Sequence, residues 1–197
     1  MDGGDSREMH KKRYEEARFL ANNYCHNLLT VEANRISSLA NIIRDVAPTH
    51  ICIPFFFDWH PEHIRVIEML NSVITTTLNS YNVLMYQVSV PMPTDAVNVC
   101  LPMSKDDHKK KWNVFKNTYV TQSFMPVKRF IAHEIIMGGL CNTYAAEPYI
   151  MMTSQKWLAC FDIFLLNENQ KKEIKESINN ITKIRKYIDS LWKTKIQ

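Results

Sequence analysis

The apolar run Ile51–Phe57, followed at once by the polar cluster Asp58–His63, constrains the fold of this chain more than any other segment. A short, nearly continuous apolar run is typical of a strand buried on both faces, as in a parallel sheet. Pro54 lies inside the run, although a central strand uses every backbone amide as a donor. We therefore expect a buried strand that ends at a polar junction, with Pro61 in the first turn of the following helix.

Helices and strands are predicted in alternation along the chain. Apolar residues at three- and four-residue spacing, together with capping and stop signals, predict helices over residues 6–24, 31–46, 61–80, 104–119 and 126–137. Strands are expected over residues 81–90 and 96–101, and a loop over 144–149. This alternation predicts an α/β fold with a mostly parallel sheet. Such domains normally begin with a strand, whereas this chain begins with a helix, so we expect that an upstream unit is missing.

The C-terminal segment 167–197 differs from the rest of the chain in charge. It carries eight Lys or Arg against four Asp or Glu, and so accounts for the whole net charge of +4. We expect one basic amphipathic helix over residues 167–195, separate from a domain over residues 1–166. Packing on that domain, assembly into a homo-oligomer and binding to a membrane surface all remain open for this helix. The charge-balanced body argues against a nucleic-acid partner.

The composition is that of a globular domain, with 46% hydrophobic and 22% charged residues. The sequence contains no run of eighteen apolar residues, so no transmembrane segment is expected. The polar N-terminus does not resemble a signal peptide, and we therefore expect a cytoplasmic protein. The five cysteines form no CxxC pair, which argues against a zinc ribbon or a disulfide framework.

Asp58, His60 and His63 are the best candidates for chemistry in this sequence. Ligands of open α/β sheets bind at the carboxyl ends of strands, where these residues are expected. Two imidazoles and a carboxylate in one turn can bind Zn²⁺ or polarise a carbonyl group. Two solvated histidines, or a helix cap, are the simpler alternative, but the strand-to-helix position favours a site. Trp59 suits either stacking on a sugar ring or packing beside the strand.

One further pair, His133 and Glu134, lies in an apolar helix. A second histidine that reaches the site is one interpretation of this pair. We favour the simpler interpretation, a partly buried pair at the surface.

The segments Pro48–Pro54 and Asp58–His63 together resemble the signature of the LmbE/PIG-L deacetylase family. That signature consists of a proline, a hydrophobic strand, an Asp, one residue, and then His-Pro-Asp-His; Glu62 replaces its second Asp. Weaker matches in the same order cover about residues 1–152, and they are Asp2–Asp5, Arg13–Ala17, Lys111–Tyr119, Thr121–Ser123 and Ala145–Tyr149.

The resemblance implies a Rossmann-like three-layer fold and a zinc-dependent hydrolase. Such an enzyme removes an acetyl group from an N-acetylglucosaminyl-type substrate, a small amino-sugar conjugate. The resemblance makes His63 the zinc ligand. It makes His60 and Asp58 the catalytic residues, with His60 stabilising the oxyanion or acting as an acid. Arg13 falls at a substrate-contacting position. Glu147 either positions a loop that closes the site or is a solvated carboxylate.

The family's other metal-binding loop, His-Pro-Asp-Asp-Glu, has no match in this sequence. That loop supplies two zinc ligands and the carboxylate that activates water. Because a catalytic zinc site uses three protein ligands and a water, we expect that this chain alone does not retain Zn²⁺. The alternative function is therefore that of a catalytically incomplete remnant acting as a binding or interaction module.

Overall fold

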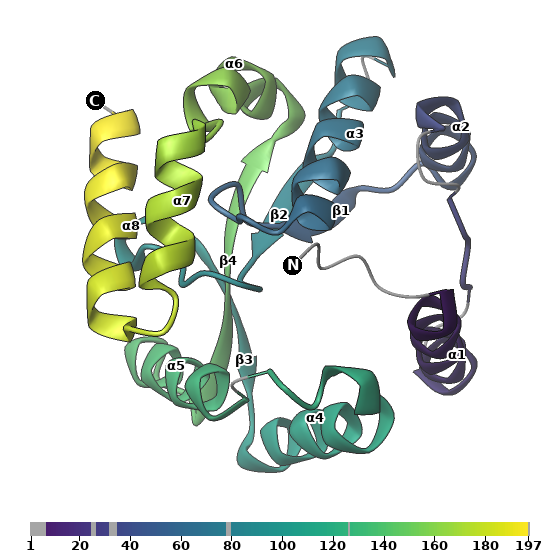
Figure 1. The fold of residues 1–197 in the computed structure, drawn as a ribbon. Coiled ribbons are helices and arrows are strands. Elements are labelled where there is room, and N and C mark those ends of the chain that lie inside the picture. The colour runs from purple at the N-terminus through teal and green to yellow at the C-terminus, as the bar shows by residue number, and fades with distance from the viewer. Residues whose placement is uncertain (1–6, 25–26, 32–34, 78–79, 126, 197) are drawn as a thin grey trace. The chain divides into compact units, whose positions relative to one another are not determined.

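A computed structural model describes residues 7–24, 27–31, 35–77, 80–125 and 127–196 (Figure 1). The chain forms two compact units, each made of two separate stretches of sequence. Unit 1 comprises Met1–Thr30 and Leu101–Glu147, and unit 2 comprises Val31–Cys100 and Pro148–Gln197. The predicted match at residues 2–5 lies outside the described residues.

The fold is α/β, as the sequence predicts. In chain order the elements are α1 (Arg7–Tyr24), α2 (Ile36–Val46), β1 (His50–Pro54), α3 (Pro61–Thr77), β2 (Asn82–Tyr86), η1 (Thr94–Ala96), β3 (Val99–Met103), α4 (Lys105–Thr118), η2 (Val120–Gln122), α5 (Val127–Leu140), β4 (Ala145–Thr153), α6 (Ser154–Phe164), α7 (Glu168–Ser177) and α8 (Ile181–Ile196).

The sheet is mixed, and the prediction of a mostly parallel sheet is wrong. Within the described residues its strand order is β1-β2-β4-β3. β1 pairs with β2 in parallel, with Ile51 opposite Val83, whereas β2 pairs with β4 antiparallel, with Val83 opposite Met152. Residues 145–149 of the segment predicted as a loop over residues 144–149 instead form the start of β4. Its poor strand propensity is overridden by pairing inside the sheet.

β1 is shorter and less buried than the predicted strand, and its position in the sheet explains why Pro54 is tolerated. β1 lies at one edge of the described sheet, where a proline is tolerated because fewer backbone donors are needed. Only the end of β1 is buried, rather than the whole strand on both faces. The phenylalanines Phe55–Phe57 follow β1 in a turn and are buried there. α3 then begins at Pro61, as expected.

Unit 2 contains a continuous hydrophobic core beneath this junction. Phe56 stacks on Trp157 of α6 with ring centroids 4.4 Å apart, and Phe57 lies 6.0 Å from Phe164. Val83 and Met85 of β2 are fully buried in the same core. The turn that leads to Asp58 is therefore anchored by aromatic packing against α6.

The C-terminal segment forms two helices that complete this core, rather than one separate helix. The Asn180 side chain accepts a hydrogen bond from the Lys183 amide at 3.0 Å, and this cap starts α8 anew. α7 and α8 pack side by side (Figure 1). Five side chains from the two helices are buried in the core of unit 2: Ile174, Ile184, Ile188, Leu191 and Trp192. Most of the apolar stripe therefore packs inside unit 2, and assembly into a homo-oligomer stays a prediction.

In unit 1, α4 and α5 lie beside the start of β4. Ser104, the first residue of the predicted helix over residues 104–119, caps α4 by accepting a hydrogen bond from the Asp107 amide at 3.1 Å. The helix predicted to end at residue 137 continues through Gly138 and Gly139, which lie within α5. A methyl group at Gly138 would lie 2.6 Å from the backbone nitrogen of Ala145, so this glycine permits close approach of β4.

Candidate functional site at the β1–α3 junction

The structure brings Asp58, His60 and His63 together in unit 2, at the carboxyl end of β1 and the first turn of α3. Asp58 follows the buried phenylalanine turn and is itself only 1% exposed. His63 lies in the first turn of α3, so its ring returns to the carboxylate of Asp58. The two imidazole rings are neighbours, with centroids 4.7 Å apart.

Three hydrogen bonds hold the buried carboxylate of Asp58. Oδ1 accepts a bond from the backbone amide of His60 at 2.8 Å. Oδ2 accepts bonds from Nδ1 of His63 at 2.9 Å and from the backbone amide of Ser89 at 3.3 Å. Because a buried carboxylate is costly unless it is hydrogen-bonded, these donors explain how the charge is accommodated. They also fix the ring of His63.

The bond to Asp58 decides how His63 presents its ring. Nδ1 must carry a proton to donate to the carboxylate, and in the neutral ring Nε2 then carries the lone pair. A carboxylate that orients a histidine in this way is the usual outer partner of a metal-ligating imidazole. The His63 side chain is 26% exposed, so the ring is held in place without being sealed off.

His60 has the opposite arrangement. Its Nδ1 accepts a bond from the backbone amide of Glu62 at 3.3 Å, so the proton of the neutral ring lies on Nε2. Neighbouring imidazoles thus present one N–H donor and one lone pair. This combination suits a site that both donates a hydrogen bond and holds an electrophile or a proton.

Trp59 packs partly against the core of unit 2, which favours the packing interpretation for much of its ring. Its centroid lies 6.0 Å from that of His60. Nζ of Lys175, from α7, lies 5.6 Å from the ring centroid of Trp59. The C-terminal segment therefore reaches the edge of this site, which the sequence did not indicate.

The donor set fits part of a zinc site and not the whole. His63 with Asp58 has the chemistry of one ligand and its orienting carboxylate. Among the described residues no group of three His, Cys, Asp or Glu side chains could hold a metal ion. Asp58 is committed to backbone and imidazole donors, which leaves His63 as the ligand that this turn offers.

The two other predicted site residues belong to unit 1. Arg13 lies on α1 and is half-buried. Glu147 lies on β4 rather than on a loop, and its Oε1 accepts a hydrogen bond from Nζ of Lys111 at 2.8 Å. It is therefore an ion-paired residue and not a solvated loop carboxylate. Participation of Arg13 and Glu147 in the site around His63 stays a prediction.

Lys111 and Glu147 form part of a buried polar network in unit 1 that the sequence did not reveal. Glu134 accepts bonds from Nζ of Lys111 at 2.6 Å, from Nε1 of Trp112 at 2.8 Å and from Nε2 of His108 at 2.9 Å. His133 and Glu134 are both buried, so the favoured interpretation as a surface pair is wrong. The spacing of three and four residues from His108 to Lys111 and Trp112 places them on one face of a helix, and this spacing could have indicated the network from the sequence.

Charge attraction sets the protonation of Lys111 in this network. Burial alone would lower the pKa of its ammonium group, but Glu147 and then Glu134 outweigh burial and raise that pKa. Lys111 therefore stays charged through the physiological range and links α4, α5 and β4.

Comparisons with known proteins establish a shared fold. No protein-family model matches the sequence, and no curated protein matches it. A solved structure that is similar to this chain is the conserved protein TT1542 from Thermus thermophilus. The TM-score is 0.51 and the sequence identity 18%, over 76% of each chain. At this identity the similarity is one of fold. No helix of the described residues is long and apolar enough to cross a membrane.

Proposed function

We propose that this chain carries part of the active site of a zinc-dependent N-deacetylase. The substrate would be an N-acetylglucosaminyl-type amino-sugar conjugate, and the reaction hydrolysis of its acetamide. The single observation that carries the proposal is the bond of 2.9 Å between Nδ1 of His63 and Oδ2 of the buried Asp58. The resemblance of residues 58–63 to the LmbE/PIG-L signature supplies the reaction class.

Each residue of the junction has a distinct role in this proposal. Asp58 keeps the proton on Nδ1 of His63, so that Nε2 is the ligand to zinc. His60, with its proton on Nε2, donates a hydrogen bond to the negative charge that develops on the amide oxygen. Bound zinc would polarise the amide carbonyl as a Lewis acid. Arg13, Trp59 and Glu147 remain candidates for contacts with the sugar.

A binding module is the second candidate function. The described residues offer one zinc ligand, whereas catalytic zinc sites use three. In this alternative the turn around Asp58 and His63 would recognise an amino sugar without hydrolysing it. The two candidates differ in whether acetate is released.

The test is acetate release from N-acetylglucosaminyl conjugates with Zn²⁺ present, measured on the chain joined to a His-Pro-Asp-Asp-Glu segment that supplies the two other zinc ligands and the carboxylate. We expect His63→Ala to abolish the activity and His60→Gln to lower it about 100-fold, the scale for loss of one oxyanion donor. His50→Ala is the matched control. It removes an exposed histidine from the far end of β1, where its ring contacts the side chains of Thr49 and Asn82. Equal activity in His63→Ala and His50→Ala would refute the assignment of His63.

A further inference from the structure

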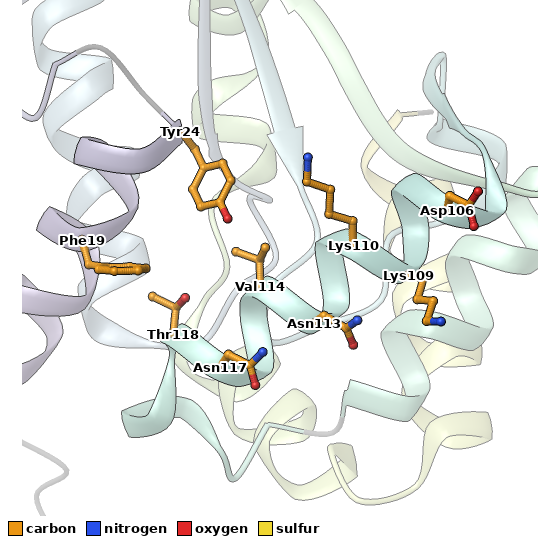
Figure 2. Close-up of a pocket in the computed structure, with 9 residues that line it drawn as sticks. All are labelled: Phe19, Tyr24, Asp106, Lys109, Lys110, Asn113, Val114, Asn117 and Thr118. Atoms are coloured by element: carbon orange, nitrogen blue, oxygen red, sulfur yellow. The ribbon is translucent and has the colours of Figure 1, made fainter.

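A hollow in unit 1, separate in its residues from the β1–α3 junction, has the features of a ligand site. It lies between α1 and one face of α4 and has a volume of about 420 Å³, within the range of roughly 300–1,000 Å³ for small-molecule pockets. Figure 2 shows Phe19 and Tyr24 extending from α1 toward α4, where Val114 and Thr118 line the same hollow.

The aromatic side of this hollow is unusual because its rings are exposed. Phe19 is 55% exposed and Tyr24 58% exposed. Neither ring packs on another aromatic ring within the described residues, whereas Trp112 and Phe115 of α4 pack on each other with centroids 5.6 Å apart. Two exposed rings over an aliphatic floor can take a flat ring between or upon them.

The facing side of the hollow, on α4, is polar and partly cationic. Lys109 and Lys110 are exposed, and neither has an ion pair to a residue that the structure describes. Asp106 lies toward the same end, so two cations against one carboxylate leave a local charge of +1. Asn113 and Asn117 follow along the helix, and their amides likewise have no hydrogen-bond partner in the described part of the chain. These side chains offer donors and acceptors to a ligand.

We propose that this groove binds a nucleotide. Aromatic faces stack on a base, lysines attract a phosphate, and amides bond to ribose hydroxyls or base edges. A bare anion would leave Phe19 and Tyr24 unused, and a neutral apolar ligand would leave Lys109 and Lys110 unused. The proposal does not depend on the deacetylase function, because every residue that carries it belongs to unit 1.

The test is a calorimetric titration of the whole chain with AMP, adenosine, inorganic phosphate and glucose 6-phosphate. AMP is expected to bind more tightly than any of the other three. Replacing both lysines by Lys109→Gln and Lys110→Gln should weaken AMP about tenfold and leave adenosine unchanged, with a smaller loss at high salt. Phe19→Ala should weaken AMP and adenosine alike, by about fivefold or more.

Lys116→Gln is the matched control, since Lys116 is an exposed lysine of α4 that does not line the hollow. It should leave AMP affinity unchanged. The proposal is overturned if AMP does not bind at millimolar concentration, or if Lys116→Gln weakens it as much as the two groove substitutions do. It is also overturned if phosphate or glucose 6-phosphate binds as tightly as AMP. All substituted side chains are exposed, and circular dichroism checks that each variant is folded.

Discussion

Gly138→Ala should destabilise unit 1 although alanine is the better helix former. The added methyl group would lie 2.6 and 2.8 Å from the nitrogen and carbonyl carbon of Ala145, and also against its Cα. Carbon atoms pack at about 3.5–4.0 Å, and a backbone contact cannot be relieved by rotating a side chain. Overpacking costs up to about 3 kcal/mol, and the helix propensity of alanine returns roughly 0.5–1 kcal/mol. The net loss should be roughly 2 kcal/mol.

The neighbouring residue supplies the control. A methyl group at Gly139 meets nothing within 4 Å, so Gly139→Ala should raise stability by up to about 0.5 kcal/mol near the end of α5. Urea denaturation measures both changes, and native-state hydrogen exchange of α5 amides places them in unit 1. If Gly138→Ala is as stable as Gly139→Ala, the close approach of α5 and β4 is wrong.

Three further predictions concern the C-terminal helices, the buried network and the site. Deleting residues 167–197 removes five core side chains, whose burial together stabilises unit 2 by about 8–15 kcal/mol at roughly 1.5–3 kcal/mol each. Unit 2 should therefore lose its cooperative thermal transition. A retained transition would contradict the packing of α7 and α8 in the core. Lys111→Met leaves Glu134 without its cation and should lower stability by roughly 2 kcal/mol in urea. Because the pKa of Lys111 is raised above 10.5, its contribution to the free energy of unfolding is complete below pH 10.5 and is lost as pH rises through the higher folded-state pKa. This loss of stability at alkaline pH should be absent in Lys111→Met. If the loss persists in Lys111→Met, other groups cause it. Asp58→Asn should weaken zinc binding about 10–100-fold, as measured by chelator competition, because the carboxylate no longer fixes the ring of His63; unchanged affinity would exclude that role.

The strand–turn–helix at the site was largely predictable because its signals are local. An apolar run, a polar turn and Pro61 at the start of α3 mark the junction directly in the sequence. The contacts of Asp58 with His60 and His63 span two and five residues, so spacing alone indicated the cluster. Ser89 was not predicted, because it reaches Asp58 across 31 residues of chain.

The remaining differences come from long-range packing. The first half of β4 contains Ala145, Ala146 and Pro148 and has little strand propensity, but its place beside β3 within the sheet makes it a strand. Strand direction likewise depends on where the chain returns to the sheet, which helical and strand periodicity do not encode. Glu134 and His108 are separated by 26 residues, so their buried contact followed from no spacing rule.

The central claim is tested most directly by measuring zinc affinity in competition with a chelator of known affinity. The measurement compares the wild-type chain with His63→Ala and His50→Ala. We predict that the wild-type chain and His50→Ala bind zinc equally, with the weak affinity of a single histidine ligand, and that His63→Ala loses at least about tenfold in affinity. Equal affinity for all three proteins would show that zinc, if bound, is held elsewhere. Zinc binding by the wild-type chain too weak to measure would mean that it holds one ligand of an incomplete site, and would favour the binding module.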